Sequence, residues 1–295
     1  MLLRDAAYLG LVACGLSIVM IGGGIDLSVG GIVCAVGIIC IRLSFAGLHG
    51  AVVVVLGVLI GALFGLLNGI VVSKIGLTEF VATLATGFAF FGMGLMFAYK
   101  DAAGVFTSVG IKSKSLLAFG HQVWESGLYP ITVCWLVLTV VMYAVMHKTK
   151  FGLYTYAIGS NQKASAMSGI DVAKTKIIGF VLSGAFAGLA AVLVTAYNRT
   201  AHTSLGNGYE FQAIAACVVG GIVLGGGKGD AVSAFLGALF MLIVTNGINK
   251  LQLEAHYQYI VQGGLIVIAI AFDAQFAKFS YRRKLKEQRM TTVNP

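Results

Sequence analysis

The sequence predicts an all-α, polytopic membrane protein. Of its 295 residues, 58% are hydrophobic and only 11% are charged, while 40 are glycine. Soluble domains carry about a quarter of charged residues and about 7% glycine, so this composition is typical of helices packed in a bilayer. The chain has only two prolines and no long polar tract. We therefore expect one transmembrane domain over residues 1–273 and a basic cytoplasmic tail over 274–295.

Charge-free windows of about twenty residues, the length that a helix needs to cross the hydrocarbon core, predict nine spans. The windows at 27–41 and 211–227 are short and rich in glycine, which is typical of broken helices in transporters. The nine windows are 6–25, 27–41, 51–73, 80–99, 126–146, 177–198, 211–227, 231–249 and 255–272.

The stretch GGGIDLSVGG, Gly22 to Gly31, places the carboxylate of Asp26 between two apolar runs that are each long enough to cross a bilayer. A charge at membrane depth is costly, so Asp26 should face protein or water, or lie at a helix end. The glycines let the backbone turn between two helices. Two compatible interpretations follow: Asp26 belongs to a path through the membrane, or it caps a helix that begins at Leu27.

Lys and Arg predict the orientation, because they are enriched in cytoplasmic loops. The loop 147–176 and the tail after 273 are both basic, and four expected spans separate them. Both should therefore be cytoplasmic. The same count places Asp26 on the cytoplasmic side and Met1 outside.

Several functions are excluded by the same sequence. The formal charge of +9 lies largely in short loops between apolar windows, so we expect no nucleic-acid partner. The five cysteines lie inside apolar segments without metal-ligand spacing, which predicts neither a metal site nor a cofactor. The stretch LGGGKGD fails the phosphate-binding pattern G-x-x-x-x-G-K-[ST], since Ile222 and Gly229 occupy two required positions. We therefore expect that the chain is not an enzyme.

Glycines recur every four residues on one face of the window 51–73, and a pair does the same in the window 177–198. Such faces let two helix backbones approach closely. The positions are Gly57, Gly61, Gly65 and Gly69, and Gly184 and Gly188.

Six polar residues inside or beside the apolar windows are candidate contacts for a solute on a wetted path. Each has an alternative role, a hydrogen bond between two helices. They are Asn68, Thr83, Thr86, Gln212, Asn246 and Asn249.

Three stretches together resemble a known family. Besides GGGIDLSVGG they are YTYAIGSNQKASAMSGIDVAKTKIIGF at 154–180 and GNGYEFQAIAACVVGGIVLGGGKG at 206–229. In this order they resemble the bacterial ABC importer permeases of the ribose/xylose/autoinducer-2 type, and the resemblance extends from residue 10 to residue 273.

The resemblance implies a permease subunit that moves a sugar or sugar-like polyol across the bacterial inner membrane. The partners that it implies are an ATP-binding cassette protein, a periplasmic substrate-binding protein, a second permease subunit and membrane lipid. Members of the family usually carry one more helix before the part that matches residues 1–20. Together with the outside placement of Met1, this predicts that one N-terminal helix is missing.

Within the loop 147–176 the sequence predicts a short capped helix. Asn161 offers a cap, the run Gln162–Ser168 favours a helix, and Gly169 ends it. Ala164 and Gly169 match the A-x-x-x-x-G signature of the family, in which such a helix couples the permease to its ATPase. The alternative is a plain solvated basic loop. The residues expected to couple are Gly159, Asn161, Ala164, Ser168, Gly169 and Ile170.

Gly24-x-Asp26 and Gly208-x-Glu210 precede two short windows from opposite sides of the membrane, as the halves of an inverted repeat would. We expect a structural or pathway role for this motif. Its residues are Asp26, Ser28, Gly30 and Glu210.

Three alternatives are left open. A branched-chain amino-acid ABC permease belongs to a related family. A secondary transporter or channel without an ATPase would need ion-coupling carboxylates deep in the spans, whereas the sequence places Asp26, Glu79, Glu210 and Asp273 near span ends. A membrane scaffold is disfavoured by a loop that suits docking. The sequence does not identify the solute, nor whether the permease pairs with a copy of itself or with a sister subunit.

Overall fold

A computed structural model describes residues 2–100, 102–104, 106–121 and 128–251, with separate residues between 257 and 271. Six helices in these ranges are long and apolar enough to cross a membrane, so the chain is an all-α, multi-pass membrane protein as predicted. They are α1 (Leu2–Ile21), α3 (Gly50–Ile70), α4 (Glu79–Phe97), α6 (Pro130–Lys148), α9 (Val172–Asn198) and α11 (Ala231–Lys250).

Two shorter apolar helices, α2 (Val29–Phe45) and α10 (Tyr209–Val219), correspond to the two short windows. The helix α2 begins two residues later than the Leu27 start that the sequence predicted, and α10 ends at Val219 although its window ran to 227. Glycines with positive φ, among them Gly221 at 102°, turn the chain after α10 and cannot continue a helix. Most of the window 255–272 lies outside the described residues, so the described part does not confirm nine spans.

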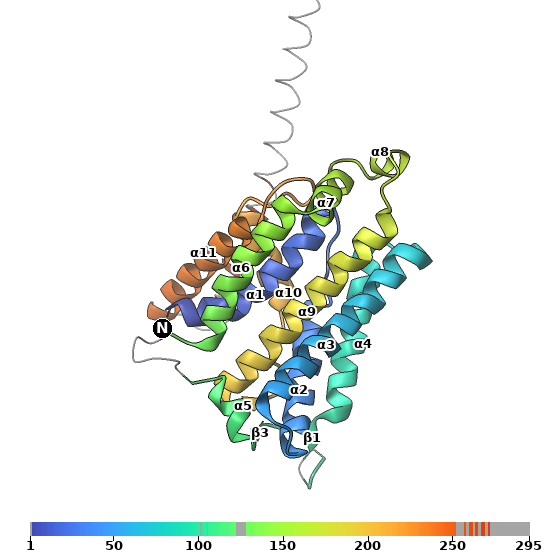
Figure 1. Cartoon of the computed structure of the whole chain (residues 1–295). Helices are drawn as coiled ribbons and strands as arrows, with labels where there is room; N and C mark the ends of the chain where they lie inside the picture. Colours follow the sequence, from blue (N-terminus) through green and yellow to red (C-terminus); the bar gives the residue numbers. More distant parts are fainter. Residues whose placement is uncertain are drawn as a thin grey trace, which may run out of the picture.

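The connections gather at the two ends of the bundle (Figure 1). One end carries α7 (Lys150–Ser160) and α8 (Gln162–Met167), and the opposite end carries α5 (Lys114–Ala118) with four two-residue strands. These strands form two antiparallel pairs that an all-α prediction omits. The pairs are β1 (Tyr99–Lys100) with β2 (Phe106–Thr107) and β3 (Val109–Gly110) with β4 (Thr200–Ala201).

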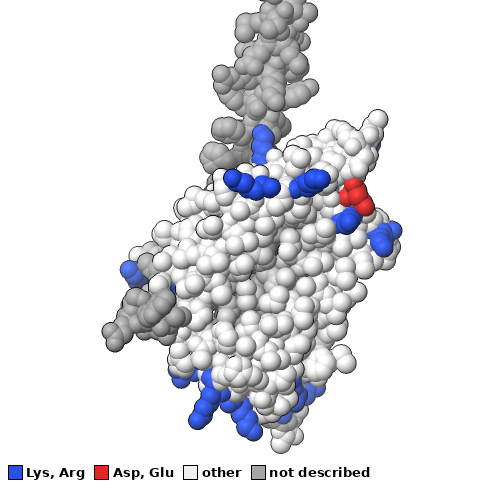
Figure 2. Space-filling model, in the orientation of Figure 1, with Lys and Arg blue, Asp and Glu red and all other residues white. Residues whose placement is uncertain are grey.

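The charged side chains lie mainly at the two ends of the bundle. Figure 2 shows Lys and Arg side chains at the two ends of the helices and a face without charge between them. Such a face suits lipid, since an ionised side chain at bilayer depth costs at least a few kcal/mol. The large apolar side chains on it are exposed to the surroundings, for example Leu59 on α3 and Val140 on α6.

The helices α3 and α9 pack against each other through the glycine faces that the sequence predicted. A Cβ at Gly61 would collide with the carbonyl oxygen of Gly184, and one at Gly65 would collide with that of Phe180. The two backbones therefore touch where the sequence predicted close packing, and that prediction is confirmed. Beyond α3 the chain makes one π-helical turn, η1 (Val71–Ile75), and ends the helix at Gly76 with φ 83°.

The helix α1 is the centre of the bundle. Of its membrane-length window 83% is buried, against 28% for α4, which lies at the periphery. Small and apolar residues on every face of α1 permit this position; Gly10 packs against the ring of Trp135, and Gly15 against Phe186. A helix that is apolar all round is suited to a buried site.

Candidate functional site

The glycine motif forms a loop that enters the bundle between α1 and α2. Gly23 has φ 81° and lies against Gly159 and Gly226, so three segments meet backbone to backbone. The amide of Gly227 also donates a hydrogen bond of 2.8 Å to the carbonyl of Ile21, the last residue of α1. We call Gly23, Gly159 and Gly226 the glycine junction. These contacts hold the start of the loop after α1 against α7 and the segment around Gly226.

Asp26, three residues beyond the junction, is fully buried. Its Oδ1 accepts hydrogen bonds from the amide and the hydroxyl of Ser28, at 3.0 and 2.6 Å, and its Oδ2 accepts one of 2.8 Å from the hydroxyl of Ser183 on α9. Hydrogen bonds to a charged group stabilise by about 1.5–3 kcal/mol each, so these three bonds compensate in part for the cost of burial. Asp26 therefore holds the loop to α9. Ser28, and not Asp26, is the N-cap residue of α2.

Three of the expected path residues belong to the same buried network. Asn68 on α3 donates from Nδ2 to the hydroxyl oxygen of Ser28 at 2.6 Å, and Thr86 on α4 donates to Oδ1 of Asn68 at 2.5 Å. Thr83 accepts the amide of Leu27 at 3.0 Å. The alternative role that the sequence left open, a hydrogen bond between segments, is therefore the geometry observed at these positions.

The N-termini of α2 and α10 meet inside the bundle. A Cβ at Gly30 would collide with Oε2 of Glu210 and lie 2.6 Å from the carbonyl oxygen of Gly206. On the neighbouring position, a Cβ at Gly31 would collide with the carbonyl oxygen of Gly87 on α4. The pair of glycines that closes the motif is thus needed to admit α10 on one side and α4 on the other.

The two short helices run in opposite directions from this meeting point, and each is preceded by a non-helical segment that enters from its own end of the bundle. This arrangement is typical of the discontinuous helices of transporters. The two acids do not hold equivalent places, however. Asp26 lies two residues before the N-cap residue Ser28, whereas Glu210 is the second residue of α10.

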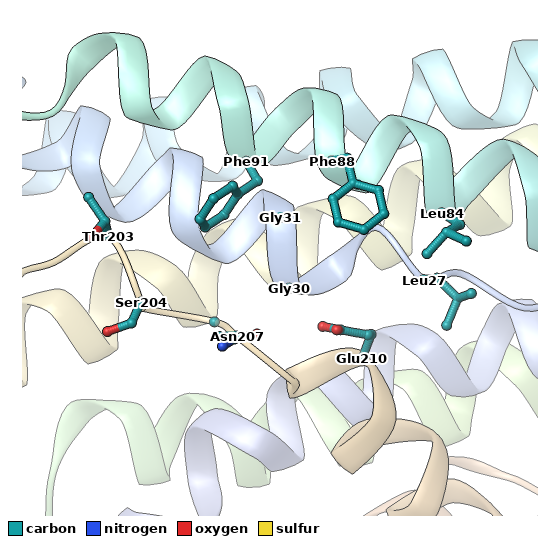
Figure 3. Close-up of a pocket in the computed structure, with 12 residues that line it drawn as sticks. Leu27, Gly30, Gly31, Leu84, Phe88, Phe91, Thr203, Ser204, Asn207 and Glu210 are labelled. Atoms are coloured by element: carbon teal, nitrogen blue, oxygen red, sulfur yellow. The ribbon is translucent and has the colours of Figure 1, made fainter.

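A cavity of about 330 Å³ lies where the two helices meet, and we call it the α2/α10 cavity. Figure 3 shows Glu210 and Asn207 on one side of it, and Phe88 and Phe91 of α4 on the other. Of these residues, sequence reasoning assigned a role only to Gly30 and Glu210. Leu27, Gly31, Gly206 and Asn207 lie in the family motifs without an assigned role, and Thr203 and Ser204 lie outside them. The lining residues are Leu27, Gly30, Gly31, Leu84, Gly87, Phe88, Phe91, Thr203, Ser204, Gly206, Asn207 and Glu210.

The other three expected path residues lie elsewhere. Gln212 does not line the α2/α10 cavity. Asn246 donates to the carbonyl of Leu242 at 3.1 Å and lines a separate cavity of about 310 Å³ beside Arg4 and Tyr197. The side chain of Asn249 lies outside the described part of the structure.

The helix α8 has the caps that the sequence predicted. Oδ1 of Asn161 accepts the amide of Ala164 at 3.0 Å, and Gly169 leaves the helix with φ 81°. The amides of Gly169 and Ile170 donate to the carbonyls of Ala166 and Ser165, at 3.0 and 3.1 Å, which is the Schellman arrangement. A helix of only six residues is thus closed at both ends.

The surface of α8 is open. The side chain of Met167 is 90% exposed, and Ala164 and Ser168 are exposed beside it. Gly159 differs from the other residues expected to couple, because it belongs to the glycine junction. A Cβ there would collide with the carbonyl oxygen of Ile21.

Two polar contacts hold this end of the molecule together. Nζ of Lys176 on α9 pairs with Glu79 at 2.6 Å and donates to Oε1 of Gln162 at 3.0 Å, which joins α4, α8 and α9. The hydroxyl of Tyr156 on α7 donates to the carbonyl of Gly229 at 2.7 Å. Burial, reinforced by the carboxylate of Asp230, raises the pKa of Tyr156, so this hydroxyl keeps its proton.

Among the described residues no group of His, Cys, Asp and Glu side chains could hold a metal ion. The five cysteines are free thiols, and Cys134 alone of them is not fully buried. Asp26 accepts three hydrogen bonds from protein donors, whereas Glu210 faces the α2/α10 cavity.

Comparison with known proteins now decides the family. The family model described as the branched-chain amino acid transport system / permease component matches residues 1–270. The chain belongs to this permease family. Components of this kind form the transport path and are not themselves catalytic, and the chain is a multi-pass inner-membrane protein.

Individual permeases are similar along almost the whole chain. The ribose import permease protein of Bacillus subtilis is 37% identical over 276 residues, which covers 92% of this chain and 83% of that protein. The D-allose transport system permease protein of Escherichia coli is 34% identical over 269 residues, covering 91% and 80%. The ribose import permease protein of Escherichia coli is 32% identical over 272 residues, covering 92% and 84%. No solved structure matches the chain.

The resemblance inferred from the three motifs is confirmed by these relatives. In this chain the glycine motif forms the loop that Asp26 ties to α9 and the start of α2. The 154–180 stretch supplies most of α7, α8 and the start of α9, and the 206–229 stretch supplies α10 and the loop with Gly226. Each motif thus belongs to a contact between segments that are far apart in the sequence.

Proposed function

We propose that this chain is the transmembrane subunit of an ATP-driven importer for a sugar or sugar-like polyol. The observation that carries the proposal is the similarity to ribose import permeases over 92% of the chain, at 32–37% identity. The D-allose and galactose/methyl galactoside permeases among the relatives also carry monosaccharides by name. A neutral polyhydroxylated solute is therefore the proposed cargo.

The proposed partners are an ATP-binding cassette protein, a periplasmic binding protein and a second permease subunit. The helix α8 is the proposed contact with the cassette protein, because it is short, capped at both ends and exposed. Met167 would enter a groove of the partner, and Lys176 would carry the movement to α4 through Glu79. Of the residues expected to couple, Asn161, Gly169 and Ile170 shape the helix ends, Ala164 and Ser168 offer surface, and Gly159 seats α7 against α1.

The proposed topology has nine spans in this chain, with the tail after residue 273 in the cytoplasm. The support comes from the sequence, in which the five lysines of the loop 147–176 and the six Lys and Arg of the tail outnumber those of the opposite side, although that end of the bundle also carries Lys and Arg (Figure 2). Lys and Arg near span ends favour the cytoplasm.

Two alternatives make different predictions. A branched-chain amino-acid permease, which the description of the family model names, would take up leucine instead of aldoses. A secondary transporter would need no ATPase and would follow an ion gradient. The burial of Asp26 removes one argument against that alternative, because the sequence had placed this acid at a span end. Asp26 already accepts three hydrogen bonds from the protein, which leaves it little capacity to bind an ion.

Uptake into cells tests the proposal. The chain is expressed with its neighbouring ATPase and binding-protein genes in a host that lacks its own aldose importers, and labelled D-ribose, D-allose, D-galactose and leucine are offered separately. We expect uptake of at least one aldose, lost when the ATPase carries an inactivating substitution. Uptake of leucine alone, or aldose uptake that persists without the ATPase, would contradict the proposal.

A further inference from the structure

The α2/α10 cavity has two chemically different sides. Glu210, Ser204 and Asn207 present oxygen and nitrogen atoms, while Phe88 and Phe91 present aromatic rings (Figure 3). Its volume of about 330 Å³ lies in the range of roughly 300–1,000 Å³ that small-molecule sites occupy. A sugar ring has a rim of hydroxyls and an apolar C–H face, so it can use both sides at once.

Glu210 has unused hydrogen-bonding capacity. It is the second residue of α10, so its carboxylate lies at the N-terminal, positive end of that helix. No Lys, Arg or His of the described ranges pairs with it. A carboxylate offers about four acceptor positions, so positions remain for donors in the cavity.

The buried network on the other side of α2 offers no such capacity. Asp26 already accepts three hydrogen bonds, from Ser28 and Ser183, and is fully buried, while Asn68 is engaged at both ends of its amide. Of the two acids that the glycine motifs supply, only Glu210 faces open space.

The α2/α10 cavity is open on one side, and lipid tails are a poor permanent neighbour for that opening. Phe88 lines the cavity and is 71% exposed, so the cavity opens to the surroundings beside this ring on α4. Glu210 lines the same cavity. A carboxylate facing hydrocarbon costs at least a few kcal/mol. Water and a second permease subunit are the covers that this surface fits.

We propose that the α2/α10 cavity is a transit site for a neutral polyhydroxylated solute, with Glu210 accepting solute hydroxyls and Phe88 packing against the apolar face of the ring. An unpaired carboxylate repels anions, so the site selects against sugar acids and sugar phosphates. This inference rests on the proposed function and adds to it a site and a charge selectivity.

Uptake of labelled D-ribose by cells that carry the complete importer tests the site. We expect Glu210→Gln to lower the initial uptake rate about tenfold or more, because one acceptor of a charge-assisted hydrogen bond is lost. Glu210→Asp, which keeps the charge, should recover part of the rate. The amount of chain in the membrane should stay within twofold of the unmodified importer.

A matched pair of variants on α4 distinguishes loss of the site from a general folding defect. Phe88→Ala removes a ring from the cavity, whereas Met96→Ala shortens a side chain that is 81% exposed and does not line it. We expect reduced uptake for the first variant alone. Uptake within twofold of the unmodified level for both Glu210→Gln and Phe88→Ala would overturn the inference.

A thiol-labelling measurement separates this inference from the proposed function. In the assembled importer, Phe88→Cys should react with a charged, membrane-impermeant maleimide, while Leu59→Cys on the exposed face of α3 should not; the chain with its own five cysteines gives the background. Absence of labelling at position 88 would overturn the transit site. If labelling occurs but none of the three aldoses is taken up, the proposed function fails while the site remains a wetted path for a polar solute.

Discussion

At the scale of single residues, Asp26 decides whether the loop after α1 stays in the bundle. Replacement by leucine would leave the amide and hydroxyl of Ser28 and the hydroxyl of Ser183 without an acceptor. Each buried unsatisfied donor costs about 1–3 kcal/mol, so Asp26→Leu should destabilise the folded chain by at least about 2 kcal/mol. Asp26→Asn keeps one acceptor oxygen and should cost about half as much. Thermal unfolding in detergent measures both.

The order of stability among the variants is the informative result, and a third variant completes it. Ser183→Ala removes one donor and leaves the carboxylate bound to Ser28, so it should lie nearest to the unmodified chain. Equal stability of all three variants and the unmodified chain would show that the Asp26 network contributes nothing.

The sequence could point to Asp26, because an acid between glycines and apolar runs is conspicuous. It could not pair Asp26 with Ser183, which is 157 positions away, or Ser28 with Asn68, which is 40 positions away. These partners are ordinary polar residues on apolar helices, and only the packing of α3 and α9 brings them to the loop. The same reason explains why Ser204 and Asn207 escaped notice.

At the scale of helices, the α3–α9 interface depends on the absence of side chains. Gly61→Val should separate the two helices, because its side chain would overlap the backbone of Gly184. Overpacking in a close-packed site typically costs about 1–3 kcal/mol, and here the backbone must move as well. The matched control is Gly92→Val on α4, where nothing lies within 4 Å of the added Cβ.

Folded yield after detergent extraction distinguishes these two variants. We expect a large loss for Gly61→Val and a yield close to that of the unmodified chain for Gly92→Val. Similar yields for both would mean that the close approach of α3 and α9 is not required for folding.

The helix α8 gives a second prediction at this scale. Met167→Glu places a charge on a side chain that is 90% exposed and has no packing role within the chain, so folding should be unaffected. Uptake by the assembled importer should fall at least about tenfold, because a buried unpaired charge would oppose docking in the partner's groove. Met167→Leu keeps the apolar surface and should retain uptake.

The alternative test positions on α8 are less selective. Gly169→Val would strain a backbone at φ 81°, and Ala164→Glu would alter the first turn that Asn161 caps. Unchanged uptake with Met167→Glu would remove α8 from the coupling contact, whatever the other variants do.

The regular part of these elements could be predicted, and the breaks could not. Uninterrupted apolar windows gave α3, α4, α9 and α11 with small boundary errors, since length and hydropathy decide them. The ends of α1 and α10 were misplaced, because Gly22 to Gly24 and Gly220 to Gly227 look apolar in a window but turn the backbone.

At the scale of the whole molecule, the proposed function assigns two parts to the chain, a path at the α2/α10 cavity and a docking contact at α8. The cavity is assembled from α2, α4, α10 and the 203–207 segment, so no single stretch of sequence contains it. Family membership could be predicted from three motifs in the sequence. In the structure each of these motifs takes part in a contact between distant segments. The solute could not be predicted, because the cavity presents few polar side chains and the sequence does not show that Thr203, Ser204, Asn207 and Glu210 face it together.

Transport by purified components tests the central claim most directly. The chain is placed in lipid vesicles with its ATPase subunit, the binding protein is supplied on the opposite side, and accumulation of labelled D-ribose, D-allose and D-galactose is followed with and without ATP. We expect accumulation of an aldose that requires ATP and all three proteins, and no ATP hydrolysis by the chain alone. Accumulation by the chain alone in response to an ion gradient, with no effect of ATP or of the partners, would contradict the account.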